Sequence, residues 1–249
     1  MAEIKIKKRD SLIVWKEPVK KPVRDMRVTV EDGCVAVCSV GGAVINEFYP
    51  GDRKLLNEGN MLVKAYGKRA EIALYVFNNR RPVEVKWGIG RMPASYPDKR
   101  IGGIPLSVTA YGRCTILVTD ARLLLNKMPE SAIADGEVTP DEIVEFVQRD
   151  IISKVGPILS AELLAIGDYT LVRGRLESLA DRITYGIRNM ENLGLRVSDT
   201  VVENLDYTED AKAVIEKYER GLIEPLNTRV AAEKAKQIKV MAEARAKRE

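Results

Sequence analysis

The chain has 249 residues, of which 45% are hydrophobic and 31% charged, so it can form one large domain or two of ordinary size. It contains no histidine, which excludes imidazole catalysis and histidine-ligated metal sites. The net charge of +4 arises from residues 227–249, where seven Lys or Arg face three Glu, and residues 1–27 carry nine basic and four acidic side chains. Basic ends indicate either a solvated surface or contact with an anionic partner.

The three cysteines, Cys34, Cys38 and Cys114, have no spacing typical of a disulfide scaffold or a metal site. We interpret them as buried or half-buried thiols in strands, which favours a reducing compartment. Cys34 and Cys38 lie four residues apart and should share one face of a strand.

The first segment, MAEIKIKKRDSLIVWK, permits two interpretations. The run SLIVW predicts a first strand, and the alternative is an interfacial membrane contact with Trp15, Lys7 and Lys8 at the headgroup level. The run is too brief for a signal peptide or for the roughly 18 apolar residues of a membrane-spanning helix.

From residue 28 to residue 125 short β-branched runs alternate with turn residues, which predicts an antiparallel or mixed sheet. Gly41 and Gly42 separate two such runs and predict a tight hairpin turn. The stretch Gly88-Ile89-Gly90 indicates a loop, because the rest of a dinucleotide fingerprint is missing.

Basic residues in the loops of this half lie near Phe77, Trp87 and Tyr96, a mixture that would suit nucleic acid but more often forms a solvated rim. The basic residues are Arg80, Arg81, Lys86, Arg91, Lys99 and Arg100. An enzyme using Asp98 or Asp120 is a third option, although no second carboxylate is paired with either at a definable spacing.

The second half is predicted to be helical around one strand. Thr139-Pro140-Asp141-Glu142 predicts a capping box and a helix that Gly156-Pro157 bends or divides. A further amphipathic helix should bury one stripe and end at Gly194. The stripe consists of Val172, Leu176, Leu179, Ile183, Ile187 and Met190.

Residues 195–205 predict a strand with a bulge or an exposed edge near Asp199-Thr200. A helix should start at Asp206 or Thr208 and break at Pro225. The charged, alanine-rich tail that follows carries Val230, Ile238 and Met241 as a candidate assembly face, because such a helix buries too little surface to be stable alone.

Three stretches in this order resemble the stomatin, prohibitin and flotillin (SPFH) domain, and most closely its soluble prokaryotic virion-core-protein-like branch. They are SLIVWKEPV, MRVTVEDGCVAVCSVGGAVINEFYPGDRKL, and YVFNNRRPVEVKWGIGRMPASYPDKRIGGIPLSVTAYGRCTILVTDARLLL. The resemblance implies a band 7 or stomatin-like scaffold without catalytic, cofactor-binding or metal-binding residues. Such a scaffold associates with itself into rings, cages or filaments, often at a membrane.

We therefore expect an α+β fold. A basic segment (1–27) and an N-terminal antiparallel or mixed β-rich subdomain (28–138) precede an α/β subdomain with helices packed on a short sheet (139–208) and C-terminal assembly helices that form a charged coiled-coil tail (209–249). The expected function is a non-enzymatic homo-oligomeric scaffold in the cytoplasm, peripheral on the anionic inner face of the cell membrane through its basic ends. The expected partners include no small-molecule substrate and no cofactor, and nucleic acid is disfavoured. The alternative is a nucleic-acid-binding or virion-like structural protein that uses the basic tail.

Overall fold

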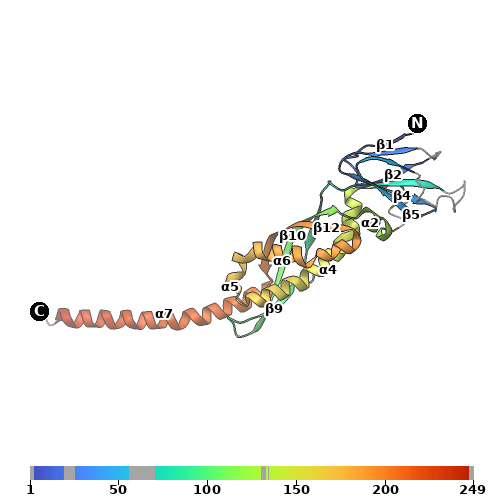
Figure 1. Cartoon of the computed structure of the whole chain (residues 1–249). Coiled ribbons are helices and arrows are strands. Elements are labelled where there is room, and N and C mark those ends of the chain that lie inside the picture. The colour runs from blue at the N-terminus through green and yellow to red at the C-terminus, as the bar shows by residue number, and fades with distance from the viewer. Residues whose placement is uncertain (1–2, 20–25, 56–70, 130–132, 134, 247–249) are drawn as a thin grey trace.

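The computed structural model describes residues 3–19, 26–55, 71–129, 133 and 135–246. It is an elongated α+β molecule, as the sequence predicts (Figure 1). Sheets form one end and the centre, and helix α7 projects from the other end. The N-terminus and the C-terminus lie at opposite extremes of the long axis (Figure 1).

The described strands run in chain order from β1 to β12, and their bounds are β1 (Glu3–Ile6), β2 (Val14–Pro18), β3 (Arg27–Val30), β4 (Cys34–Val40), β5 (Ala43–Phe48), β6 (Gly51–Lys54), β7 (Ile72–Asn78), β8 (Val83–Gly88), β9 (Ala94–Asp98), β10 (Ile104–Val118), β11 (Glu137–Val138) and β12 (Leu195–Tyr207). The described helices are α2 (Ala121–Lys127), α4 (Pro140–Ile166), α5 (Tyr169–Val172), the 3₁₀ helix η1 (Arg173–Arg175), α6 (Leu176–Gly186), the 3₁₀ helix η2 (Arg188–Leu193) and α7 (Glu209–Ala246).

The N-terminal lobe, strands β1–β7 and β11, contains two sheets. One has the order β1-β3-β6 and the other β11-β2-β7-β4-β5. Buried side chains of both sheets form a shared core, in which Val28 and Val30 of the first meet Cys34 and Cys38 of the second. Cys34 and Cys38 both point into this core, so the predicted shared face is confirmed. The predicted β4–β5 hairpin is also confirmed, and Gly41 and Gly42 in its turn have φ of 55° and 85°.

The central lobe, sheet β12-β10-β8 with β9 paired to the start of β10, carries helices α4 and α6 (Figure 1). Helix α4 begins with the predicted capping box, in which Glu142 N–H donates to Thr139 Oγ1 and the Glu142 carboxylate accepts from Thr139 N–H. The helix ends at Gly167, whose φ is 65°. Its inner face buries a residue on nearly every turn against the sheet and against α6.

The strands are grouped differently from our prediction. We assigned residues 28–138 to one β-rich subdomain, whereas β10 pairs with β8, β9 and β12 in the central lobe. We also assigned residues 1–27 to a separate segment, but β1 pairs with β3 and β2 pairs with β7 inside the N-terminal lobe. Pairing between strands distant in the chain carries no local sequence signal, so the change of sheet between β7 and β8 could not be found from the pattern.

Gly156-Pro157 was predicted to bend or divide its helix and Pro225 to break its helix, and neither proline divides the helix. Helix α4 runs through Pro157 and α7 runs through Pro225. A proline removes one backbone hydrogen bond, and the remaining turns on both sides hold each helix together.

The amphipathic stripe from Val172 to Met190 is buried or partly buried as predicted, but the segment is not one helix. It divides into α5, η1, α6 and η2. The interruptions fall at Gly174 and beside Gly186, residues with low helix propensity. Gly194 ends η2 with φ of 75°, as expected.

Strand β12 forms one edge of the central sheet, and its register shifts twice along β10. One shift lies between the Thr115–Asp199 and Ile116–Val197 pairs, which confirms the irregularity predicted near Asp199. Residues after Gly194 thus lead the chain back along the sheet to the point where α7 starts.

Candidate assembly surface

The candidate assembly surface is the exposed part of α7 together with the junction that holds α7 on the central lobe. Near its start, Ala211 is buried and Val214, Ile215 and Tyr218 pack partly against the core. From Glu219 onward every described side chain of α7 is exposed. The helix is therefore attached along its first three turns and free beyond them (Figure 1).

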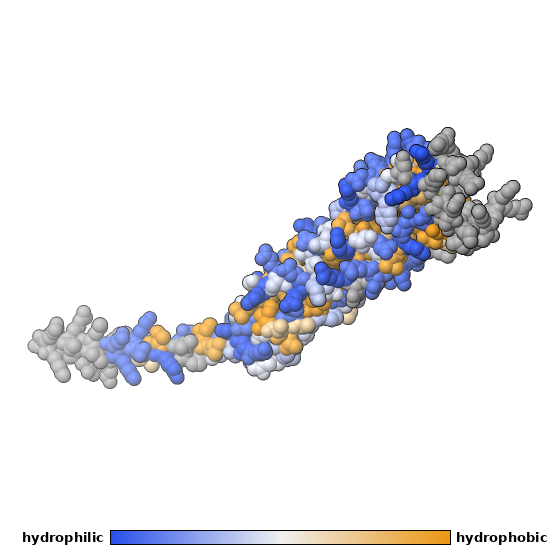
Figure 2. All heavy atoms as spheres, viewed as in Figure 1, coloured by the Kyte–Doolittle hydropathy of each residue, from blue (hydrophilic) through white to orange (hydrophobic). Residues whose placement is uncertain are grey.

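The free part of α7 exposes large apolar side chains. Leu222, Ile223 and Val230 are 48%, 53% and 50% exposed. Hydrophobic patches interrupt the mainly hydrophilic surface of the projecting helix in Figure 2. Of the predicted assembly residues, Val230 is exposed as an assembly contact requires; Ile238 and Met241 lie in α7, but their side chains are outside the described ones.

The start of α7 is fixed by β10 and by the end of β12. The backbone N–H of Thr208 donates to Ser107 O at 2.9 Å, and Thr208 Oγ1 accepts from Ala211 N–H at 3.3 Å. Lys212 Nζ lies 2.7 Å from the Asp206 carboxylate. This hydrogen bond lowers the pKa of Asp206 and raises that of Lys212.

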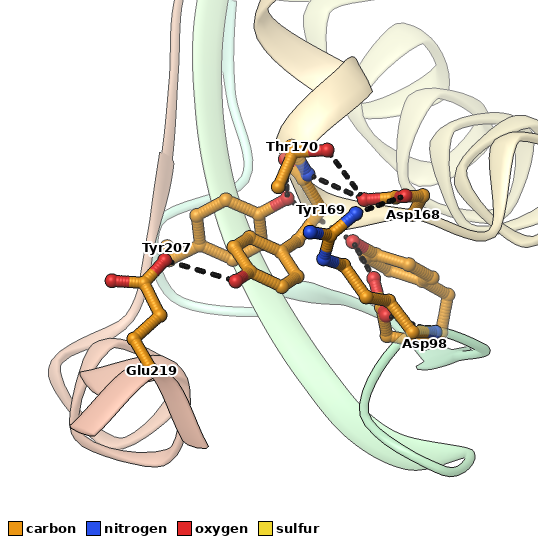
Figure 3. A network of polar contacts seen from close by, with 8 residues as sticks. Asp98, Asp168, Tyr169, Thr170, Tyr207 and Glu219 are labelled. Atoms are coloured by element: carbon orange, nitrogen blue, oxygen red, sulfur yellow. Dashed lines mark hydrogen bonds and ion pairs between the residues drawn. The ribbon is translucent and has the colours of Figure 1, made fainter. Parts of the chain in front are cut away.

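A polar network joins this junction to the tip of the β9–β10 hairpin (Figure 3). The Tyr96 and Tyr207 hydroxyls lie 3.1 Å apart, Tyr96 also donates to Asp98 at 3.2 Å, and Tyr207 donates to the Tyr169 carbonyl at 3.3 Å. The Tyr169 hydroxyl in turn donates to the Glu219 carboxylate at 2.9 Å. Burial is the main reason that the pKa values of Tyr96, Tyr169 and Tyr207 are raised, so all three hydroxyls remain protonated donors.

The outer edge of the network is an ion pair on the α4–α5 turn. Arg100 Nη1 lies 3.2 Å from the Asp168 carboxylate, and the Arg100 guanidinium lies 5.9 Å from the centre of the Tyr169 ring. Asp168 caps α5 by accepting from Thr170 N–H and Oγ1, and these hydrogen bonds, more than Arg100, lower its pKa. Sequence reasoning missed the network, because its residues come from four separate segments with no shared spacing.

The predicted membrane-contact residues separate into two groups. Trp15 is fully buried in β2, with the Arg9 guanidinium 5.7 Å from its ring centre, so its side chain cannot reach a membrane surface in this fold. That part of the prediction is wrong, because Leu12 to Trp15 of the run SLIVW are buried and the run leads into the core strand β2. Lys7 and Lys8 are exposed, with Lys8 Nζ 3.0 Å from Asp10.

The carboxylates and aromatic residues that the sequence offered as catalytic or nucleic-acid-binding candidates have structural roles in the fold. Asp98 accepts from Arg100 N–H and from Tyr96, and Asp120 caps α2 by accepting from Leu123 N–H at 2.7 Å. Phe77, Trp87 and Tyr96, expected beside the basic loops, are buried and offer no stacking platform.

The cysteines are free buried thiols, as the sequence predicts. Burial raises the pKa of Cys34 to about 11 and those of Cys38 and Cys114 to about 12. Across the residues that the structure describes, no cluster of three or more Cys, Asp or Glu is placed to hold a metal ion.

Within the described ranges, no single helix is long and apolar enough to cross a membrane. Helix α4 and the segment Tyr169–Gly186 reach that criterion only as a pair, bent by 116°. Both pack against the central sheet and contribute buried side chains to its core.

With this geometry established, comparison with known families identifies the class. A model of the SPFH domain-Band 7 family matches residues 19–222, which covers the N-terminal lobe from β3 onward, the central lobe and the attached start of α7. The chain belongs to this family, and membership supports a scaffold-like role. No curated protein matches the chain. The narrower resemblance to the virion-core-protein-like branch stays a prediction.

Proposed function

We propose that the protein is a non-enzymatic scaffold that assembles with copies of itself, with α7 as the helix that joins neighbouring copies. The observation that carries this proposal is the projection of α7. It is a 38-residue helix whose described side chains from Glu219 onward are exposed and include Leu222, Ile223 and Val230. An isolated helix has little intrinsic stability in water, so packing against a second α7 would supply what the body of the same chain does not.

The geometry favours copies that lie side by side with their α7 helices parallel. Because α7 leaves one end of an elongated body, parallel copies can align both the bodies and the helices (Figure 1). A contact between unlike faces that repeats around an axis closes into a ring, and one that does not close continues as a filament.

The mass of the purified full-length protein tests this proposal. Native mass spectrometry at micromolar concentration should give particles that are multiples of the 27.8 kDa chain, and electron microscopy should show rings, cages or arcs. A strictly monomeric species would remove the proposed function.

Membrane association is the second component of the proposal, with the N-terminal end as the contact. Lys7 and Lys8 are exposed and directly follow β1, which lies at the end of the molecule away from the projecting part of α7 (Figure 1). A membrane that meets the N-terminal end would leave α7 free to assemble. Juxtamembrane lysines attract anionic lipid by about 1 kcal/mol each, and the attraction weakens with salt.

Flotation with vesicles containing one third phosphatidylserine tests this component in the whole chain. The Lys7→Glu/Lys8→Glu variant should float much less than wild type, whereas Lys86→Glu/Lys217→Glu, with the same charge change at exposed sites elsewhere, should float normally. Equal flotation of both variants would show that Lys7 and Lys8 do not form the contact.

The sequence-based alternative, a nucleic-acid-binding structural protein, has weaker support. This alternative relies on the basic tail, and the basic loops add no stacking surface to it, since Phe77, Trp87 and Tyr96 beside them are buried. Absence of a mobility shift with single-stranded or duplex DNA at 50 mM salt would remove it.

A further inference from the structure

The attachment of α7 to the body is strong at its first turn. Thr208 N–H donates to Ser107 O at 2.9 Å, Ala211 is 4% exposed, and Lys212 Nζ lies 2.7 Å from Asp206. A backbone hydrogen bond, a buried contact and an ion pair coincide within five residues. This turn is a fixed point from which the helix extends.

The next two turns are less tightly held. A cleft of about 410 Å³ lies beside α7, with Arg173 and Tyr207 on the body and Ile215 and Glu216 on the helix among its lining residues. Ile215 and Tyr218 are only partly buried. The open space on this side of α7 permits the helix to shift toward the cleft with a smaller loss of packing than a fully buried segment would suffer.

One hydrogen bond closes the far end of the cleft, from the Tyr169 hydroxyl to the Glu219 carboxylate at 2.9 Å (Figure 3). The Tyr169 side of this contact is held in place, since its carbonyl accepts from Tyr207 and its ring lies beneath Arg100. The Glu219 side is an exposed residue on the helix. If the contact opens, Glu219 and the helix move while Tyr169 stays with the body.

The helix is also weakened directly after this contact. Pro225 has no backbone N–H, so the carbonyl of Gly221 has no donor at the usual position four residues later. A Cβ added at Gly221 would meet no atom within 4 Å, so the helix surface at this position is open. Both features follow Glu219 by two to six residues.

We propose that the Tyr169–Glu219 hydrogen bond is a latch that sets the direction in which α7 leaves the body, and that α7 reorients about its first turn when the latch opens. This inference rests on the proposed function, because the partner that α7 meets is the α7 of a neighbouring copy. Bodies that pack side by side with different curvature require α7 to leave at different angles. Because only one hydrogen bond spans the cleft, α7 can adopt a range of angles for a small loss of free energy. A fully packed start of the helix would fix one angle.

The test is a distance measurement within one chain by electron spin resonance. Spin labels are placed on the full-length protein at Glu177→Cys on α6 and Glu233→Cys on α7, both exposed positions. The native thiols are buried with raised pKa values and do not compete for the label. Labelled protein is mixed with about tenfold unlabelled protein, so that distances between copies do not contribute.

The wild-type protein should give one narrow distance distribution. Tyr169→Phe and Glu219→Ala should each broaden it about twofold, and the double variant should broaden it no further, because both changes remove the same bond. Glu219→Gln, whose amide oxygen still accepts the hydrogen bond, should retain the wild-type width. Tyr111→Phe, which removes an exposed hydroxyl from the central sheet, is the matched control.

Unchanged widths in Tyr169→Phe and Glu219→Ala would overturn the latch, and so would a wild-type distribution already as broad as theirs. Because Glu219 is exposed, its substitution leaves the core intact and keeps the test interpretable. Native mass spectrometry of the same samples separates the two proposals. Assembled particles with unchanged widths refute the latch alone, and monomers whose widths respond to the variants refute only the proposed function.

Discussion

The hydroxyl of Tyr169 in α5 donates a 2.9 Å hydrogen bond to the carboxylate of Glu219 in α7, fifty residues further along the chain. Among the described residues, it is the hydrogen bond to the body that lies furthest along α7. Tyr169 is positioned by Tyr207, which is itself bonded to Tyr96. The direction of the projecting helix is therefore tied to the hydroxyl network in the central lobe.

The first prediction concerns the centre of this network. Tyr207→Phe removes the hydroxyl that joins Tyr96 to the Tyr169 carbonyl and should lower the free energy of unfolding by about 1–2 kcal/mol. Urea denaturation followed by circular dichroism measures this change. Tyr111→Phe should stay within about 0.5 kcal/mol of wild type, because Tyr111 is exposed. Equal effects of the two variants would show that the network adds no stability.

The second prediction concerns the close approach of β10 and β12. A Cβ at Gly112 would lie 2.0 Å from Val201 O and 2.8 Å from Trp87 Cζ2, so the strand or the indole must move. Gly112→Ala should cost about 2–4 kcal/mol of unfolding free energy in the same assay. Gly90→Ala, where a Cβ meets no atom within 4 Å, is the control and should be nearly neutral. A Gly112→Ala variant as stable as Gly90→Ala would contradict this strand packing.

Local chemistry made part of this fold predictable from the sequence. The β4–β5 turn follows from two adjacent glycines, the start of α4 from the Thr139–Glu142 spacing, and the irregularity in β12 from the charged residue at Asp199. In each case the residues that determine the geometry are neighbours in the chain.

The features that could not be predicted from the sequence depend on contacts between residues distant in the chain. Strand β10 pairs with β12, nearly a hundred residues later, so the boundary between the lobes was placed too late. Trp15 was predicted as an interfacial anchor because its local pattern does not reveal that it lies in the core shared by the two N-terminal sheets. The network of Tyr96, Tyr169, Tyr207 and Glu219 is assembled only by the fold.

The third prediction concerns pH. The pKa of Asp206 is lowered below its usual value near 3.8, chiefly by the hydrogen bond from Lys212. Because the folded-state pKa is below the unfolded-state pKa, the stabilisation is complete above the unfolded value and is lost as pH falls through the folded one. Asp206→Asn should therefore be less stable than wild type at pH 7, by about 0.2–1 kcal/mol for this partly exposed pair, and closer to wild type at pH 3.

Urea unfolding of both proteins at pH 7 and pH 3 measures this difference. Asp199→Asn is the control, since Asp199 is exposed. The free energy of unfolding of this variant should equal that of wild type at both pH values. If the gap between Asp206→Asn and wild type stayed constant from pH 7 to pH 3, the ion pair would not be its source.

The fourth prediction concerns the cysteines. Burial raises the pKa of Cys34 to about 11 and those of Cys38 and Cys114 to about 12, so almost no thiolate is present at pH 8. The folded protein should release no thionitrobenzoate from Ellman's reagent within minutes, and the guanidinium-unfolded chain should release three equivalents. Rapid labelling of even one thiol in the folded protein would contradict the described burial.

The most direct test of the central claim is the particle mass of a protein whose projecting apolar face has been charged. Ile223 and Val230 are seven residues apart and share one face of α7, whereas Thr228 lies on the opposite face. Native mass spectrometry should show that Ile223→Glu/Val230→Glu converts the assembly into monomers or much smaller particles, while Thr228→Glu keeps the wild-type mass. Identical particle masses for all three proteins would contradict the claim that copies of this chain assemble through α7.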